Sequence, residues 1–323
     1  MKFYLSQEKE PIGDVWGMAV DEKENIFIPD RSFSNIKIYD NKGRLKKIFG
    51  QKGEGPEEFG KPTRIDVNNK YICIQDPGLL RYIIFDKKFK ELRRFFYLIG
   101  GSDNFVLNGN RLIVNAYFRD KKGGEFKGVI LDFKGKIQKT LFPIKYPKND
   151  AWNRIINLDA LLNVSKNGEI FVVKTSKVEI FKFDKKGNLI KKFGKNPSFF
   201  IPVRRTKDFD EMLRWGRAPQ GIKAGERWYA SFSWVSGIFV LEDLLGIAIR
   251  KFNRKLNKWE CYLQFYDFEG NLLEEEIKLK DVGYSSYNGF FTDSNHKDIF
   301  YILEINRDFD PPQHIFFKYQ VHK

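Results

Sequence analysis

A short pattern recurs along the chain: an apolar strand ends in Asp, and Gly follows after two further residues. It occurs in IKIYDNKG, VILDFKG, IFKFDKKG and LQFYDFEG, and a fifth copy, YIIFDKKF, has Phe89 where the Gly is expected. The aspartates of these copies are Asp40, Asp86, Asp132, Asp184 and Asp267, with separations of 46, 46, 52 and 83 residues. A period of this length is that of one blade of a β-propeller, and the last separation is a period plus an insertion.

A second pattern, a polar turn followed by a short apolar strand, counts the blades. It occurs six times, as DEKENIFI, NNKYICI, NGNRLIV, SKNGEIFV, LLGIAI and DSNHKDIFYI. Several of these strands are continuous apolar runs, which indicates that both faces are buried. The aromatic content of 16%, with 32 Phe and 14 Tyr, also favours strands over helices. We therefore predict an all-β fold, a six-bladed β-propeller with four-stranded antiparallel blades.

The two ends of the chain predict how the ring closes. The sixth repeat has strands near 289–292, 299–305 and 314–321, and the chain then stops one strand short. The N-terminal MKFYLS precedes the first repeat, and we expect it to complete the last blade as its outer strand, which removes a free sheet edge. Residues 1–323 then form a single domain, with an insertion at about 196–230 before blade five.

The stretch FGQKGEGPEEFGKP, residues 49–62, has two interpretations: a phosphate-binding loop, or a link between two blades. Its Gly53-Glu54-Gly55 core precedes Pro56, two further carboxylates and another strand. A dinucleotide site needs a helix N-terminus at this place, and nearby carboxylates repel an anion. The stretch is therefore predicted to be a connector whose glycines serve turn geometry.

The first blade, GMAVDEKENIFIPDRSFSNIKIYDNKGRLKKIFG, and this connector resemble an NHL-type repeat. The whole chain resembles bacterial six-bladed β-propeller proteins with NHL-like blades, many of which are exported or lipid-anchored. It departs from the pattern at Glu57, where the connector often has Gly, at Phe89, and in the insertion. The resemblance implies the fold rather than an activity. We expect an extracytoplasmic protein, periplasmic or lipid-anchored, if this is a mature chain, and a cytoplasmic one otherwise.

Motifs for metal or nucleophilic catalysis are absent from the sequence. The histidines are His296, His314 and His322, and there is no CxxC, HExxH or GxSxG spacing. Some six-bladed lactonases hold Ca²⁺ with carboxylates of the central channel, and this likeness suggests three candidate ligands, Asp30, Asp76 and Glu304. Acidic residues after strands more often cap turns, so we expect no cofactor, with Ca²⁺ as the alternative.

The strand order of a propeller gathers the loops after each second strand and the connectors between blades at one rim. Arg and Trp concentrate binding energy at interfaces, and we expect this rim to bind a ligand. The predicted ligand-binding residues are Asp30, Arg31, Arg64, Asp76, Arg81, Arg119, Trp152, Arg154, Arg204, Arg205, Trp215 and Arg217. The opposite rim takes the hairpin tips, which carry Lys42, Lys87, Lys88, Lys134, Lys185 and Lys186.

The insertion is predicted to contain one helix, DFDEMLRWGRA, with Asp208 as its cap and Pro219 beyond its end. It is either a functional element of the rim or a lid that only packs on it.

The formal charge of +15 has two explanations, solvated lysines at the hairpin tips or a basic face that attracts anionic partners. We predict a non-enzymatic binding or scaffolding propeller that recognises a protein, a peptide or an anionic carbohydrate on the Arg-rich rim. The alternative is a Ca²⁺-dependent hydrolase or lyase that works in the central channel. No recognised RNA motif or basic tail supports nucleic-acid binding, and no apolar run is long enough for a membrane span. We expect a monomer.

Overall fold

The computed structural model of the protein describes residues 1–8, 10–96, 100–119, 125–143, 152, 160–279, 289–293, 298–306 and 310–322. It contains six four-stranded antiparallel sheets, and one further short pair of strands, β6 (Gln51–Lys52) and β7 (Glu58–Phe59). The first strands of consecutive sheets contact one another in turn, and the first strand of the sixth sheet contacts that of the first sheet. The sheets are therefore blades around a central axis, as the sequence predicts.

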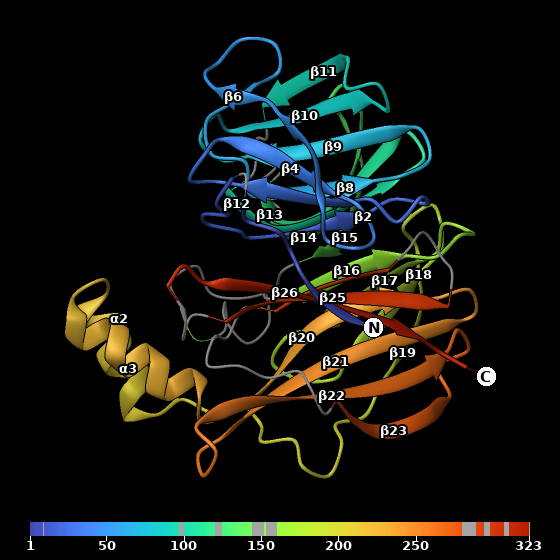
Figure 1. The fold of residues 1–323 in the computed structure, drawn as a ribbon. Coiled ribbons are helices and arrows are strands. Elements are labelled where there is room, and N and C mark those ends of the chain that lie inside the picture. The colour runs from blue at the N-terminus through green and yellow to red at the C-terminus, as the bar shows by residue number, and fades with distance from the viewer. Residues whose placement is uncertain are drawn as a thin grey trace.

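The strands of each blade follow one another in the sequence, except in blade 6 (Figure 1). Blade 1 contains β2 (Ala19–Val20), β3 (Ile26–Asp30), β4 (Asn35–Tyr39) and β5 (Leu45–Phe49), and blade 2 contains β8 (Arg64–Val67), β9 (Tyr71–Asp76), β10 (Arg81–Asp86) and β11 (Glu91–Phe96). Blade 3 contains β12 (Gly100–Asn108), β13 (Arg111–Arg119), β14 (Glu125–Asp132) and β15 (Ile137–Pro143), and blade 4 contains β16 (Ala160–Val164), β17 (Ile170–Lys174), β18 (Ile180–Phe183) and β19 (Leu189–Phe193). Blade 5 contains β20 (Ser233–Val240), β21 (Leu244–Asn253), β22 (Lys258–Asp267) and β23 (Leu272–Leu279), and blade 6 contains β24 (Gly289–Asp293), β25 (Ile299–Asn306), β26 (Gln313–Gln320) and β1 (Lys2–Tyr4).

The N-terminal strand closes the ring, as the sequence predicts. β1 pairs antiparallel with β26, with Phe3 opposite Phe316, and the two rings lie 5.0 Å apart. The Ser6 amide then donates to the Gly43 carbonyl at 2.9 Å, which joins the same segment to blade 1. Two ends of the chain are thus held in one blade, and β26 has no free edge.

The hydrophobic core is divided among the interfaces between blades. Six clusters of buried side chains each draw on two neighbouring blades. In β9, Ile72 and Ile74 pack toward blade 1, whereas Cys73 packs toward blade 3. Both faces of such a strand are therefore buried, which is why its sequence is a continuous apolar run instead of an alternating one.

The Asp-x-x-Gly turns pack each blade onto the outer strand of the preceding one. In blade 3, the Asp132 carboxylate accepts the amides of Lys134 and Lys136, both at 2.9 Å. Gly135 has a φ of +76° and lies so close to Phe95 of blade 2 that a Cβ would come within 2.6 Å of that ring. Phe89 takes the same backbone conformation without glycine, with a φ of +68°, and its own ring packs at a tilt against Phe49 of blade 1, with the ring centres 4.7 Å apart. The repeated turn thus packs neighbouring blades against each other.

Polar side chains on the inner strands also join neighbouring blades. Asp66 of β8 accepts the amide of Leu107 in β12 at 2.6 Å. Asn104 of β12 donates to the carbonyl of Leu162 in β16 at 3.0 Å, and Asn163 of β16 makes a longer contact of this kind to β20. These three side chains therefore contribute to the cohesion of the ring.

The insertion before blade 5 contains two helices, α2 (Lys207–Trp215) and α3 (Pro219–Tyr229), so the prediction of one helix was incomplete. Thr206, not Asp208, precedes the first helical residue, and Pro219 begins the second helix instead of following the first. Proline is well placed at the first position of a helix, where its missing N–H needs no partner. Two glycines in α3 obscured its pattern, but Gly221 packs so closely on the turn that a Cβ would lie 2.4 Å from the Gly216 carbonyl.

Candidate functional site

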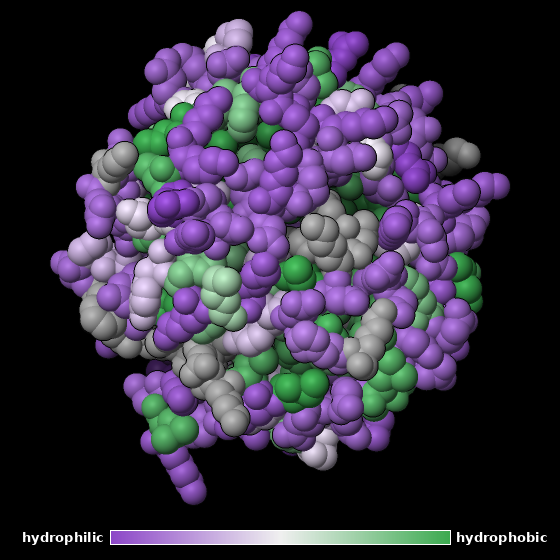
Figure 2. Space-filling model, turned by 45° about the vertical axis from the view of Figure 1, so that its right-hand side comes forward, coloured by the Kyte–Doolittle hydropathy of each residue, from purple (hydrophilic) through white to green (hydrophobic). Residues whose placement is uncertain are grey.

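One rim of the ring holds the loops after each second strand and the connectors between blades. We call it the connector rim; in Figure 1 it lies at the left, with β6, α2 and α3. The opposite rim carries the Asp-x-x-Gly turns, where Lys42, Lys88, Lys134, Lys185 and Lys186 are exposed and Lys87 lies 3.5 Å from Glu22. Figure 2, which brings that side forward, shows a largely hydrophilic surface with small separated hydrophobic patches. The connector rim is the more varied surface and is the candidate site.

The connector 49–62 is a link between blades, and its glycine loop already holds a carboxylate. The Glu58 side chain accepts the Gly55 amide at 2.8 Å and the Gln51 side-chain amide at 3.0 Å. These hydrogen bonds, that of Gln51 first, hold the pKa of Glu58 below its usual range. Arg94 of blade 2 donates to the carbonyls of Glu54 and Gly55, both at 2.8 Å. The loop is fixed onto the ring, and its own acid takes the position that an anion would need.

Asp30 and Asp76 occupy equivalent positions at the ends of β3 and β9, and both are fully buried. Asp30 accepts the Gly13 amide at 2.8 Å and the Lys37 ammonium at 2.7 Å. Asp76 accepts the amides of Gly60 and Lys61 at 2.6 and 2.8 Å. The structure thus places these predicted ligand contacts inside the rim, where each carboxylate holds an incoming connector against its blade.

Glu304, the third candidate for calcium, is buried in an ion pair with Arg250 that joins blades 6 and 5. Asp30, Asp76 and Glu304 therefore do not fit a shared Ca²⁺ site, since their oxygens are engaged by Lys37, by backbone amides and by Arg250. Across the residues that the structure describes, no three His, Cys, Asp or Glu side chains come together in a group that could hold a metal.

On blade 1 the rim presents a half-buried cation against an exposed aromatic ring. The Arg31 guanidinium carbon lies 5.0 Å from the ring centre of Trp16, which is 47% exposed. Asp14 orients both, because it accepts from Arg31 at 3.2 Å and from the Trp16 indole at 2.8 Å. The half-buried Arg64 at the start of β8 lies beside Gly17. Sequence reasoning missed Trp16, which directly precedes the first blade.

Blade 2 repeats this arrangement with different residues. The Arg81 guanidinium carbon lies 4.9 Å from the ring centre of Phe96, which is 61% exposed at the end of β11. Leu80 and Phe33 are exposed on the neighbouring loops of blades 2 and 1. The rim of these two blades therefore presents two cation and aromatic pairs, each preformed within the protein.

The insertion has its own aromatic core, which anchors it to blade 5. Trp228 is fully buried, with Phe209 at 5.0 Å and Trp234 of β20 at 5.4 Å, and its indole donates to the Arg204 carbonyl at 2.9 Å. The predicted ligand residue Trp152 packs into this cluster, 5.1 Å from Phe209, and has a structural role there. The base of the insertion is thus packed on blade 5.

The other predicted residues of the insertion are at its surface. Arg204, Arg205, Trp215 and Arg217 are all exposed, and Arg205 pairs with Asp210 at 2.8 Å. Arg154 and the side chain of Arg119 lie outside the described residues. Of the predicted set, the residues of the insertion are therefore exposed, whereas Arg31, Arg64 and Arg81 are half-buried on the connector rim.

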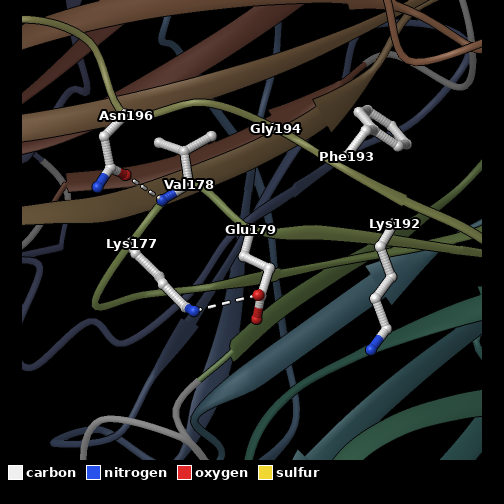
Figure 3. A pocket seen from close by; sticks show the side chains of 7 residues that line it. All are labelled: Lys177, Val178, Glu179, Lys192, Phe193, Gly194 and Asn196. Carbon is white, nitrogen blue, oxygen red and sulfur yellow. Dashed lines mark hydrogen bonds and ion pairs between the residues drawn. The ribbon is translucent and has the colours of Figure 1, made fainter.

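An open pocket of about 360 Å³ lies where blade 4 meets the start of the insertion (Figure 3). It is lined by Lys177, Val178, Glu179, Lys192, Phe193, Gly194 and Asn196. Burial alone would raise the pKa of Glu179, but hydrogen bonds from Lys174 and Lys177 outweigh it and lower that pKa. The Asn196 side chain is engaged as well, since it accepts the Val178 amide at 2.8 Å. The pocket's polar groups are largely paired with one another, which suits a supporting role at the rim.

A charged network on blade 5 supports the insertion. Glu260 accepts from Lys278 at 2.6 Å, from Tyr262 at 2.8 Å and from Asn253 at 3.0 Å, and Phe199 of the insertion stacks on Tyr262 at 4.2 Å. Burial alone would raise the pKa of Glu260, but these hydrogen bonds, led by that of Lys278, lower it to about 2.

We expect this network to make the stability depend on pH. A carboxyl whose pKa is lower in the folded state stabilises the protein above its unfolded pKa, and this contribution is lost as the pH falls through the folded pKa. Glu260→Gln should therefore cost about 1 to 2 kcal/mol near neutral pH, and the difference from wild type should shrink between about pH 4.5 and pH 2. Urea unfolding of both proteins across this range measures it; a difference that does not change with pH would contradict the assignment.

Comparison with known proteins supports the fold. The model of the DUF5128 family, described as a 6-bladed beta-propeller, matches residues 7–162. The chain is a six-bladed β-propeller. A DUF4221 family member from Bacteroides vulgatus superposes with a TM-score of 0.68 at 13% identity, over 99% of this chain and 97% of that one. A Bacteroides fragilis protein described as exported superposes with a TM-score of 0.64 at 13% identity, over 100% and 95%.

No curated protein matches the chain by sequence. Identities of 13% show a shared fold and leave the ligand open. In the described part of the chain, each helix is too short or too polar to cross a membrane.

Proposed function

We propose that the protein is a non-enzymatic binding propeller that recognises an anionic partner, a peptide, a protein or a charged carbohydrate, on the connector rim. The observation that carries this proposal is the pair of cation and aromatic contacts on blades 1 and 2, in which half-buried Arg31 and Arg81 lie against the exposed rings of Trp16 and Phe96. Each guanidinium is held against a ring before any ligand arrives, so little side-chain freedom remains to be lost on binding.

The guanidinium groups of the rim support the same proposal. The buried acids Asp30 and Asp76 are neutralised by Lys37 or by backbone amides, and they contribute no exposed negative charge. Arg204 is exposed, Arg31 and Arg81 are half-buried, and Arg31 is paired with Asp14 at 3.2 Å. Guanidinium groups recognise carboxylate and sulfate through two parallel hydrogen bonds. A net charge of +15 adds long-range attraction for such a partner.

The test removes three cations from the rim and compares them with three from the opposite side. The rim variant is Arg31→Gln, Arg81→Gln and Arg204→Gln; the matched control is Lys42→Gln, Lys134→Gln and Lys186→Gln. Calorimetry with an acidic peptide and an anionic oligosaccharide should show binding to the wild type that falls at least about tenfold in the rim variant. The control should change by less than about twofold, apart from a general effect of charge that salt removes. Equal losses in the two variants would refute a rim site, and no binding of either probe to the wild type would refute the ligand class.

A further inference from the structure

The turn between α2 and α3 has a composition unlike the rest of the insertion. We call residues 213–223, LRWGRAPQGIK, the hairpin tip. All of them except Ala218 and Gly221 are exposed, including Trp215 at 51%, Ile222 at 52% and Leu213 at 46%. Its charged residues are Arg214, Arg217 and Lys223, all cations, and it holds no acid. The tip thus combines large exposed apolar side chains with charge of one sign.

The acids of the hairpin lie toward its base, where they are paired. Asp208 accepts from Arg227 at 2.6 Å, and Asp210 accepts from Arg205 at 2.8 Å. Glu211 also contacts Arg227, at 3.3 Å, and the first acid after the tip is Glu226, about one turn further along α3. The positive charge of the tip is therefore not balanced by neighbouring carboxylates within 213–223.

The apolar residues of the tip are exposed even though the hairpin has a core of its own. Phe209 and Trp228 are fully buried at the base, and the helices pack closely through Gly221 and through Gly225, where a Cβ would lie 3.2 Å from the Met212 sulfur. In Figure 1 the two helices project away from the blades. The tip is thus a convex element on a rigid support, and its apolar groups face solvent.

We propose that the hairpin tip docks on an anionic lipid surface. Trp215, Leu213 and Ile222 enter the boundary between headgroups and acyl chains, while the three cations contact lipid phosphates. Exposed Trp with surrounding basic residues is the side-chain combination that partitions to this boundary. A convex tip fits a lipid surface, which needs no preformed groove, whereas a small ligand needs a concave site. This function goes beyond recognition on blades 1 and 2 and does not depend on it.

The test is co-sedimentation of the full chain with vesicles of phosphatidylcholine, with and without phosphatidylglycerol. We expect binding to the anionic vesicles and at least about tenfold less to the neutral ones. Arg214→Gln, Arg217→Gln and Lys223→Gln together should weaken binding by at least about tenfold, and Trp215→Ser with Ile222→Ser should weaken it comparably. The control Lys42→Gln, Lys134→Gln and Lys186→Gln removes the same charge from the opposite rim and should retain binding within about threefold.

Brominated lipids separate insertion from loose attraction. They should quench part of the tryptophan fluorescence of the wild type, and this quenching should be absent in Trp215→Phe while vesicle binding persists. Failure to sediment with anionic vesicles would overturn the proposal, as would equal losses in the tip and control variants. Binding of the tip to a soluble acidic peptide but not to vesicles would assign it instead to a protein partner. Arg31 and Arg81 are unchanged in every tip variant, so failure here leaves the rim proposal standing.

Discussion

Glu304→Gln is expected to destabilise the protein by about 3 to 5 kcal/mol, because it leaves the Arg250 guanidinium charged and without its acid inside the ring. The side chains of Arg250 and Glu304 are 1% and 2% exposed, so water cannot replace the lost partner. The two residues stand on the second strands of blades 5 and 6, and the pair therefore acts across a blade interface. Urea unfolding followed by circular dichroism measures the change.

The double variant Arg250→Met with Glu304→Leu is the control for this prediction. It removes both charges and keeps apolar volume, and such replacements are often neutral or stabilising. We expect it to be clearly more stable than Glu304→Gln. A Glu304→Gln protein within about 1 kcal/mol of the wild type would show that the pair is hydrated or dispensable.

Deletion of residues 1–6 is the second change with a large expected effect. It removes β1 from blade 6, together with the contact of Phe3 with Phe316 and the buried side chain of Leu5. Burial of Leu5 and half of Phe3 alone corresponds to about 3 kcal/mol, and the lost pairing adds to this. The truncated protein should melt at a lower temperature and aggregate more readily, because β26 becomes an open edge.

Tyr4→Ser is the matched control for the deletion. Tyr4 is 51% exposed, and its replacement leaves the backbone pairing of β1 intact. We expect this variant to melt close to the wild type. Equal melting temperatures for the truncated and full-length proteins would mean that β1 does not close the ring.

Much of the fold could be predicted from the sequence, because its signals are local. The period of the Asp-x-x-Gly turns and the six polar turns before apolar strands predict the number of blades. Phe89, which stands where the other turns have glycine, also has a positive φ, +68°. The helix α3 was missed because its glycines read as breaks in a pattern, whereas Gly221 and Gly225 allow two helices to approach closely.

The candidate site was predictable only in part. Placement of Arg31, Arg81 and Arg204 on one rim followed from strand order; in the structure Arg204 is exposed, and Arg31 and Arg81 are half-buried. Asp30 at the end of β3 and Trp152 were predicted on the same rim, yet Asp30 is fully buried and Trp152 packs on Phe209. Residue type and position in a loop do not distinguish these outcomes.

The sequence by itself determined the architecture: the blade count, the connectors, and the strand that closes the ring. These features depend on turn chemistry and on which strand faces are apolar, and both are properties of a few consecutive residues. Only the tertiary structure decided which polar groups remain available at the rim. The availability of a polar group depends on partners remote in sequence, such as Gly13 for Asp30 and Arg250 for Glu304. In the hairpin it depends on the distance between the paired acids at the base and the cations at the tip.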